Sequence, residues 1–304
     1  MTRHVPVMLE ETLRFLEPGP GKRIVDLTLG GGGHSEALLQ AGAEVIAFDR
    51  DAVALQRATD RLSPHSENFI GVHREFGALA AVLDELGFGQ VDGVLMDLGL
   101  SSDQLDDPGR GFAFRFDGPL DLRFDTSRGV PAAELLAHED VGTIERWLRE
   151  YGELRSARGV AREISARARQ GTMTTTELRQ IVAARLPGHV KPEPELARLF
   201  QALRIAVNDE LGQLETILEC LPDRLHAGGV FVAISYHSLE DRRVKRMLRR
   251  LSGRVDRGSR HLPAPDLDPA TFEDLTPKVL RPTDEEVARN PRARSARLRA
   301  GRRL

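Results

Sequence analysis

Short apolar runs alternate with amphipathic helical patterns over the first third of the chain, and this alternation constrains the fold more than any other feature. The apolar runs cover residues 23–29, 43–49, 68–73 and 91–98, and the helical patterns between them cover residues 34–41, 51–62 and 79–86. Strands that alternate with helices of this length form right-handed βαβ units, in which helices cover both faces of a parallel sheet. We therefore expect an α/β domain, with Asp51 as the N-cap of its second helix.

The alternation stops after Leu105. Residues 106–128 show no clear period, and residues 131–187 carry only short helical patterns. Thr174 and Glu177 have the spacing of a capping box at the start of one of them. This part of the chain is therefore predicted to be helical.

A long helical pattern and a late strand follow. Apolar residues recur at helical spacing from Leu196 to Leu218, which predicts one long helix, and a glycine pair separates it from a strand at residues 229–235. The economical interpretation is a discontinuous α/β domain of residues 1–105 and 201–304, interrupted by an all-helical insertion of residues 106–200.

Composition excludes several classes of protein. The chain of 304 residues has one cysteine, Cys220, which rules out an intramolecular disulfide and a cysteine-rich metal site. No run is long and apolar enough to span a bilayer, and the N-terminal segment has no apolar core of the signal-peptide type. We expect a cytoplasmic protein without a metal site.

Charge is distributed unevenly along the chain. Residues 1–140 hold 12 Lys/Arg and 24 Asp/Glu, whereas residues 141–304 hold 31 and 22. Basic residues gather at residues 242–260 and in the last part of the chain, residues 289–303. Such clusters suggest a polyanionic partner, although a solvated helix face and a frayed tail would look the same.

Four consecutive glycines, residues 30–33, join the first predicted strand to the first predicted helix. Ligands bind at the carboxyl ends of such strands, where glycines let the backbone approach them closely. Asp49 ends the second strand 19 residues after Gly30, where a carboxylate can bind ribose hydroxyls. A tight turn without a ligand is the alternative for the glycines alone.

The glycine loop lacks the motifs of two common nucleotide-binding loops, and this narrows the class of nucleoside that it can bind. A P-loop needs Gly-Lys-Ser/Thr, but the chain has Gly-His-Ser, and Glu36 occupies the position where a dinucleotide-binding loop has its last glycine. S-adenosylmethionine fits better, because its ribose suits Asp49 and its amino-acid end suits the glycine loop. A nicotinamide oxidoreductase is a distant alternative.

A polar cluster follows the fourth predicted strand. It consists of Asp97, Ser101, Ser102, Asp103 and Gln104. The carboxyl ends of parallel strands share one edge of a sheet, so we expect these side chains beside the same pocket. Helix caps and turn contacts are the alternative role for them.

Several longer strings resemble the ribosomal RNA small-subunit methyltransferase H family over almost the whole chain, from His4 to Arg299. They are H-V-P-V-M-L-E-E, D-L-T-L-G-G-G-G-H-S, F-D-R-D, D-L-G-L-S-S-D-Q-L-D, R-G-F-A-F-R-F-D-G-P-L-D-L-R, L-R-I-A-V-N-D-E-L, S-Y-H-S-L-E-D-R-R-V-K and N-P-R-A-R-S-A-R-L-R. The resemblance implies a Rossmann-type methyltransferase domain with a helical insertion. It also implies S-adenosylmethionine-dependent methylation of the exocyclic N4 of a cytidine in the decoding region of bacterial 16S rRNA, within the small ribosomal subunit.

The resemblance also implies roles for individual residues. The methionine end of the cofactor would lie against Gly32, Gly33 and His34, the ribose against Asp49, and the adenine against Phe76, while Asp97 and Gln104 would complete the cofactor site. Two positions depart from the family pattern: Thr28 stands where a small residue is usual, and Tyr236 stands where phenylalanine is usual.

No single residue of the sequence accounts for activation of the amine. Many amino-methyltransferases place Asn/Asp-Pro-Pro-Tyr/Phe after the fourth strand, but this chain has Asp-Leu-Gly-Leu there. Asp97 or Asp103 could accept a hydrogen bond from the amine, Asn208 could offer a carbonyl, and His237 could take the proton. For Asn208 a helix-to-loop contact is the alternative, and for His237 a structural hydrogen bond.

Basic and aromatic residues predict an RNA-binding surface. Arg110, Arg115 and Arg123 form a basic and aromatic stretch with Phe112, Phe114 and Phe116, a pattern that can stack on unpaired bases. For most of the phenylalanines we favour the alternative, that they anchor the insertion to the core. Arg242, Arg243 and Lys245, together with the basic C-terminal segment, would contact phosphates. Cys220 lies in an apolar run, which favours a buried thiol over a nucleophile.

Two other functions remain open from the sequence. One is a methyltransferase of the same fold that acts on another RNA or on protein. The other is an RNA-binding factor in small-subunit assembly that has kept a cofactor-shaped pocket. The oligomeric state cannot be inferred from the sequence.

Overall fold

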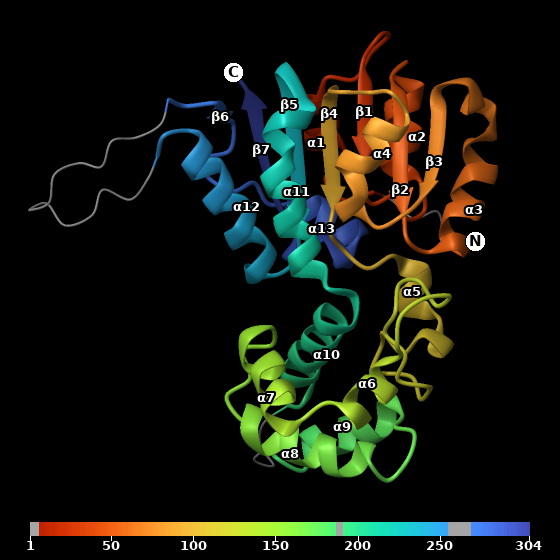
Figure 1. The fold of residues 1–304 in the computed structure, drawn as a ribbon, viewed down its shortest axis with the longest axis vertical. Helices are drawn as coiled ribbons and strands as arrows, with labels where there is room; N and C mark the ends of the chain where they lie inside the picture. The colour runs from red at the N-terminus through yellow and green to blue at the C-terminus, as the bar shows by residue number, and fades with distance from the viewer. Residues whose placement is uncertain (1–5, 187–190, 255–268) are drawn as a thin grey trace, which may run out of the picture. The chain divides into compact units, whose positions relative to one another are not determined.

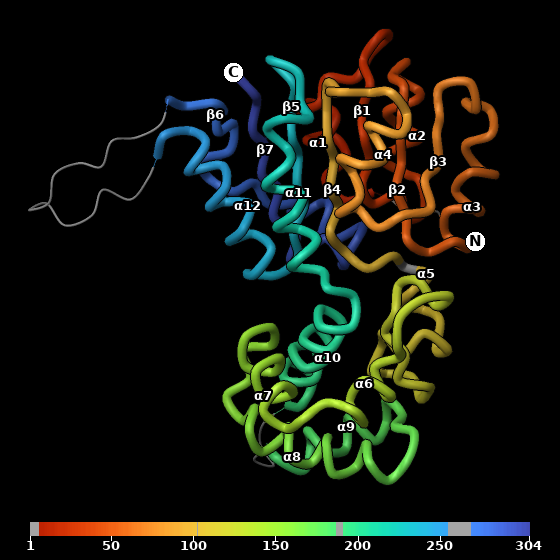
Figure 2. The backbone as a smooth tube through the Cα atoms, viewed as in Figure 1, coloured from red at the N-terminus to blue at the C-terminus, as the bar shows by residue number. Residues whose placement is uncertain are grey.

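The computed structural model describes residues 6–186, 191–254 and 269–304 (Figures 1 and 2). The chain forms two compact units. The first unit contains Met1–Gly99 and Gly212–Leu304, and the second contains Leu100–Leu211. The second unit therefore extends beyond the insertion of residues 106–200 that the sequence suggests.

The first unit is built on a seven-stranded sheet with the strand order β3-β2-β1-β4-β5-β7-β6 (Figure 1). The strands β1 to β5 are parallel, and β7 runs antiparallel to both of its neighbours. The strands are β1 (Arg23–Asp26), β2 (Glu44–Asp49), β3 (Phe69–His73), β4 (Val91–Asp97), β5 (Leu225–Ser235), β6 (Phe272–Asp274) and β7 (Arg297–Arg303). The order reverses between β1 and β4, and the carboxyl ends of strands at such a reversal are where open α/β sheets bind ligands. The predicted α/β class and the strands expected from the apolar runs are confirmed.

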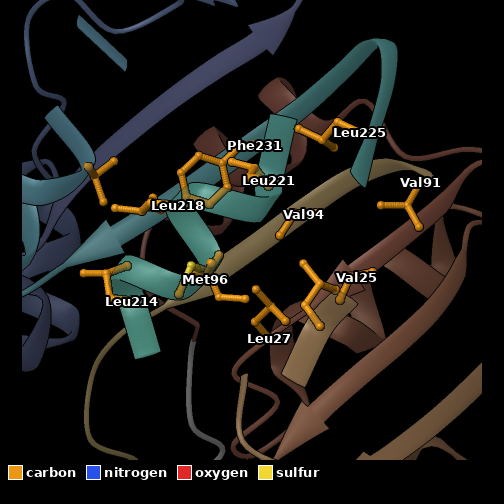
Figure 3. Packing of buried hydrophobic residues seen from close by; sticks show 14 of the residues in the cluster. Val25, Leu27, Val91, Val94, Met96, Leu214, Leu218, Leu221, Leu225 and Phe231 are labelled. Atoms are coloured by element: carbon orange, nitrogen blue, oxygen red, sulfur yellow. The ribbon is translucent and has the colours of Figure 1, made fainter. Parts of the chain in front are cut away.

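Helices cover both faces of this sheet. One face packs against α4 (Leu79–Glu85), α11 (Glu210–Arg224) and α12 (Ser238–Leu251). The other packs against α1 (Leu9–Leu16), α2 (Gly33–Gln40) and α3 (Ala52–Leu62). Figure 3 shows the first face, where leucines of α11 meet side chains of β1, β4 and β5. Both faces of the central strands are therefore apolar, as a parallel sheet between two helical layers requires.

The last described residues form a strand, so the frayed tail that was the alternative interpretation of the basic C-terminal segment is wrong for residues 297–303. β7 pairs along its length with β5, and Leu298 and Ala300 are fully buried. Arg299 is buried as well, and its Nε donates to Asp241 Oδ1 at 2.6 Å. In this segment, small and apolar residues alternate with arginines. That alternation is a strand pattern, but the many arginines make it difficult to recognise from the sequence. α13 (Asp284–Arg289) and a short 3₁₀ turn (Pro291–Ser295) precede the strand.

The second unit is helical. Its helices are α5 (Ser102–Asp106), α6 (Ala132–His138), α7 (Val141–Glu150), α8 (Ala157–Ala168), α9 (Thr175–Ala183) and α10 (Glu193–Asn208). They enclose a core of their own, to which α7, α8 and α10 contribute most of the buried aliphatic side chains. Thr174 and Glu177 form the predicted capping box at the start of α9.

The single long helix predicted from Leu196 to Leu218 is wrong. Two helices, α10 and α11, share the apolar pattern, and Asp209 between them has a left-handed backbone with φ of 49°. Aspartate tolerates this conformation better than most residues, so a helical period alone does not reveal the break. Within the described ranges, no helix is long and apolar enough to cross a membrane.

Candidate functional site

The glycine loop lies between the end of β1 and the start of α2. Gly30 and Gly32 have positive φ values of 50° and 75°, which other residues adopt at a cost, and α2 begins at Gly33. Arg61 of α3 donates to the carbonyl of Gly31 at 2.8 Å and forms an ion pair with Glu36. A Cβ on Gly31 would meet nothing within 4 Å, so the backbone can be approached closely there, whereas a Cβ on Gly33 would lie 2.5 Å from Cγ of Pro6.

Asp49 joins the glycine loop to the end of β2. Its Oδ2 accepts from the backbone N–H of Gly30 at 2.8 Å, and its Oδ1 accepts from that of Asp51 at 2.8 Å. Each carboxylate oxygen can accept a second hydrogen bond, so acceptors remain for ribose hydroxyls. Burial raises the pKa of Asp49 to about 6. Asp51 caps α3 as predicted, accepting from the N–H groups of Val53 and Ala54.

Asp26, at the end of β1, is a functional candidate that the sequence analysis missed. It is 1% exposed, and it accepts from Ser35 Oγ at 2.7 Å and from the N–H of Thr28 at 3.1 Å. Burial raises its pKa, and its hydrogen bonds and the nearby His34 act against that rise. The available signal was its place as the last residue before the glycine-loop segment, at the carboxyl end of the central strand.

Asp97 is the last residue of β4, and several neighbouring groups contact it. Its backbone N–H donates to Thr28 Oγ1 at 2.6 Å, and its Oδ1 accepts from the hydroxyl of Tyr236 at 2.8 Å. Its Oδ2 lies 3.7 Å from Nε2 of His34. Thr28 and Tyr236, the two departures from the family pattern, therefore both contact Asp97.

The tyrosine ring fits because residue 99 is glycine. A Cβ there would lie 2.7 Å from Cε2 of Tyr236, closer than real side chains come. Burial raises the pKa of Tyr236 well above its usual value, and the negative charge of Asp97 adds to that rise. The hydroxyl is therefore a proton donor to the carboxylate throughout the physiological pH range.

His34 is the second residue of α2 and is 7% exposed. Neither of its ring nitrogens makes a hydrogen bond to another described residue. A buried imidazole with free polar atoms loses stability unless a ligand or water completes it. A polar ligand or a water molecule at the glycine loop, next to Asp97, would therefore complete His34.

His237 begins α12, directly after Tyr236. Glu240 Oε2 accepts from the backbone N–H groups of Tyr236 at 2.9 Å and His237 at 3.3 Å, and its Oε1 lies 3.0 Å from Nε2 of His237. Nδ1 of His237 has no hydrogen-bond partner among the described residues. Glu240, which is 3% exposed, was not identified from the sequence, although its capping-box spacing after His237 was a usable signal.

Phe76 lies in a short 3₁₀ turn, Phe76–Ala78, after β3. Its half-buried ring packs against the core, and the guanidinium of Arg50 is 5.6 Å from the ring centroid. Its place after β3, near the strand that carries Asp49, is compatible with the adenine role that the resemblance implies, which stays a prediction.

Gln104, Asp103 and Asn208 belong to the second unit. Gln104 forms a capping box with Ser101, donating its N–H to Ser101 Oγ and accepting from the N–H of Ser101. Asp103 lies in the first turn of the same helix, α5. The helix-cap alternative thus describes Gln104, and its cofactor role stays a prediction.

The side chain of Asn208, at the end of α10, forms hydrogen bonds with the loop before α6. Its Oδ1 accepts from the N–H of Phe124 at 2.8 Å, and its Nδ2 donates to the carbonyls of Leu122 and Arg204 at 2.7 and 2.9 Å. The helix-to-loop alternative therefore describes this side chain. A carbonyl oxygen can accept two hydrogen bonds, so the catalytic role of Asn208 stays a prediction.

The basic and aromatic stretch is mostly structural. Arg110 donates to the carbonyls of Arg123 and Phe124, and Arg123 pairs with Asp121. Phe112 stacks on Phe124 with centroids 5.4 Å apart, and Phe114 packs edge-on against Phe200. Arg115 is exposed and pairs with Asp106 at 2.5 Å, so it stays a prediction for RNA contact.

In the part that the structure describes, the basic cluster after β5 lies on α12 except for Arg254, which follows that helix and pairs with Asp274. Arg242 and Lys245 are exposed, whereas Arg243 is half-buried and pairs with Glu215 of α11 at 2.6 Å. The rest of the cluster, residues 255–260, lies outside the described residues. The phosphate contacts of Arg242, Arg243 and Lys245 stay predictions.

Comparison with known proteins shows the family of this chain. The family model described as the MraW methylase family matches residues 1–304. A "Ribosomal RNA small subunit methyltransferase H" of Anaeromyxobacter dehalogenans is 47% identical over 99% of this chain and 98% of its own length. A protein of the same name in Sorangium cellulosum is 45% identical over 99% of this chain and 91% of its own length.

Similar solved structures are more distant. An rRNA methylase from Streptococcus thermophilus has a TM-score of 0.43 and 12% identity, covering 100% of this chain and 99% of that one. A SAM-dependent O-methyltransferase from Thermotoga maritima has a TM-score of 0.42 and 13% identity, covering 100% of this chain and 68% of that one. Those scores are low, and the assignment depends on the sequence matches. The family match over the whole chain and the identity to its relatives show that this chain belongs to the MraW methylase family.

Proposed function

We propose that this protein transfers a methyl group from S-adenosylmethionine to the exocyclic N4 of a cytidine in the decoding region of 16S rRNA. The names of its relatives support an rRNA of the small subunit as the substrate. One structural observation, the surroundings of Asp97, supports this methyl transfer most directly. Asp97 has one oxygen held by Tyr236, and its other oxygen lies beside the buried His34, which makes no hydrogen bond to another described residue.

The residues of the first unit fit S-adenosylmethionine. His34 has free buried nitrogens, the backbone near Gly31 is open to close approach, and Asp49 retains acceptor capacity at the end of β2. The glycine loop and His34 would hold the amino-acid end, Asp49 the ribose and Phe76 the adenine. Bound there, the cofactor supplies a methyl group that its sulfonium has already activated.

Asp97 is the residue that we assign to the acceptor amine. The lone pair of a cytosine amine is delocalised into the ring, so the amine is a poor nucleophile. A carboxylate that accepts from its N–H groups favours the tetrahedral form, in which the lone pair is available. Because Tyr236 and Thr28 fix Asp97 from two sides, little reorganisation is needed when the amine arrives.

His237 is the candidate for removing the proton that the amine loses after transfer. A proton on Nε2, facing Glu240, leaves the lone pair on Nδ1 free to accept. Asp97 itself is the alternative proton acceptor. The variant His237→Gln separates them, since it should lower turnover only if the imidazole takes the proton.

The experiment that tests the function is a methyl-transfer assay. The protein is incubated with S-adenosylmethionine and small subunits that lack the modification, and the digested RNA is analysed by mass spectrometry. N4-methylcytidine is the expected product, and Asp97→Asn should lower its formation by a larger factor than it weakens cofactor binding, which calorimetry measures. Cofactor binding without a methylated nucleoside would contradict the proposed substrate and favour an assembly factor.

The cellular setting follows from the substrate. An enzyme that modifies the small ribosomal subunit works in the cytoplasm, with the subunit as its partner. Fractionation of cells should place the protein in the cytoplasm with small ribosomal subunits or their RNA, and its absence from those fractions would contradict this.

A further inference from the structure

The exposed side of α8 carries three arginines and no carboxylate. Arg158, Arg162 and Arg169 are all exposed, the last as the C-cap of the helix. At 3.6 residues per turn these positions fall within an arc of about 40°. Ala166 is the fourth exposed residue of this side. We call Arg158, Arg162 and Arg169 the arginine stripe. The opposite side of α8 is buried, through Ala157, Val160, Ala161, Ile164, Ser165 and Ala168.

Among the residues that the structure describes, the members of the arginine stripe have no ion-pair partner, in contrast to two other arginines near α8. Arg167 pairs with Glu177, and Arg185 pairs with Glu163 across Gly159. By contrast, no carboxylate of the described chain forms an ion pair with any member of the arginine stripe. A solvated amphipathic helix usually mixes both signs of charge on its outer face, and this one does not.

The positive charge of the arginine stripe is local. Residues 100–211 contain 16 Lys/Arg and 18 Asp/Glu, so the helical unit as a whole is not basic. A surface that concentrates positive charge on an otherwise acidic unit attracts an anionic partner at that place. Two of the predicted RNA-binding arginines of this unit, Arg110 and Arg123, are engaged inside it.

We propose that the arginine stripe binds phosphates of the substrate RNA. Arginine presents a planar fork of donors that matches phosphate oxygens, and the stripe contains no lysine. With a rise of 1.5 Å per residue, Arg158 and Arg162 lie about 6 Å apart along the helix, and Arg169 about 10 Å further on. The arginine stripe can thus contact several phosphates of one strand. This inference rests on the proposed function, because it takes the substrate to be RNA.

The test is the salt dependence of RNA binding by the full chain. The probe is transcribed, unmodified 16S rRNA, titrated at several salt concentrations between about 0.05 and 0.2 M. Replacing all three residues, Arg158→Gln, Arg162→Gln and Arg169→Gln, should weaken binding at least about tenfold. It should also reduce the slope of log affinity against log salt by about 2–3, because each lost phosphate contact removes close to one released counterion.

The chain offers a matched control on the same unit. Arg128, Arg149 and Arg198 are also exposed, but each pairs with a carboxylate: Asp125, Glu145 and Glu195 respectively. Changing these three to glutamine alters the net charge of the protein equally. The control should keep the wild-type slope. A second variant with lysine at the three stripe positions should keep most of the slope, since it keeps the charge.

Three outcomes would overturn the inference. The glutamine variant could bind with an unchanged slope, the control could lose as much affinity as the stripe variant, or the stripe could be needed only for anionic vesicles and not for RNA. Thermal melting and cofactor calorimetry of each variant show whether both units remain folded. If wild-type protein methylates its substrate while the stripe variant binds RNA normally, the inference fails and the proposed function stands.

Discussion

Asp49 shows how one residue connects the glycine loop to cofactor affinity. Burial raises its pKa to about 6, so the free protein loses this carboxylate's charge as the pH falls through 6. Ribose hydroxyls bind the charged form better, so binding should be constant near pH 8 and weaken towards tenfold per unit below about pH 6. Calorimetry with S-adenosylmethionine from about pH 8 to pH 5 measures this.

Two variants isolate the contribution of Asp49. Asp49→Asn should bind weakly and lose the dependence near pH 6, whereas Asp60→Asn, an exposed position on α3, should match wild type. A wild-type affinity that stays flat down to pH 5 would contradict the assignment of Asp49 to the ribose.

Tyr236 and Asp97 form a second pair that can be tested without activity. The chain has two tyrosines, so the variant Tyr151→Phe leaves Tyr236 as the only one to titrate. The charge of Asp97 helps to raise the pKa of Tyr236, hence Asp97→Asn in that background should lower it. Burial, the larger cause, remains, so the value should stay above the ordinary one. Ultraviolet absorbance during alkaline titration follows the ionisation, and an unchanged midpoint would show that the two groups are not coupled.

At the scale of elements, α12 and β7 depend on a buried ion pair. Arg299 of β7 donates to Asp241 of α12, and both side chains are largely shielded from water. Arg299→Ala leaves Asp241 without its partner, so it should lower the free energy of unfolding by about 2–3 kcal/mol. The double variant Arg299→Met with Asp241→Leu should recover most of that loss. Chemical denaturation measures both, and equal stability of Arg299→Ala and wild type would contradict the structural role.

The same elements show what a sequence can and cannot reveal. The strands β1, β2 and β4 were predictable, because a strand that is buried on both faces must be a continuous apolar run. The edge strand β3, whose residues are half-buried or exposed, followed from its place in the alternation of strands and helices. β7 was not, since its arginines find partners, such as Asp241, that are distant in sequence. The glycine loop and Asp49 follow from local spacing, but Asp26, Glu240 and the engagement of Asn208 depend on contacts that only the folded chain creates.

At the scale of the whole molecule, each unit has a core of its own. The second unit, Leu100–Leu211, encloses its apolar side chains between its own helices, so residues 100–211 should fold when produced alone. The fragment 106–200, which the sequence suggested, lacks Leu203 of the core and Asn208, whose amide holds the loop at residues 122–124.

The two fragments therefore make a direct comparison. Fragment 100–211 should be helical by circular dichroism and melt cooperatively. Fragment 106–200 should melt at least about 5 °C lower, because in a domain of this size a loss of about 1 kcal/mol or more in the free energy of unfolding shifts the melting midpoint by that much. Asn208→Ala in the longer fragment should lower the midpoint as well, since it leaves the N–H of Phe124 without its acceptor. Equal melting of the two fragments would mean that the end of α10 adds nothing to the core, and would place the boundary of the helical unit inside that helix.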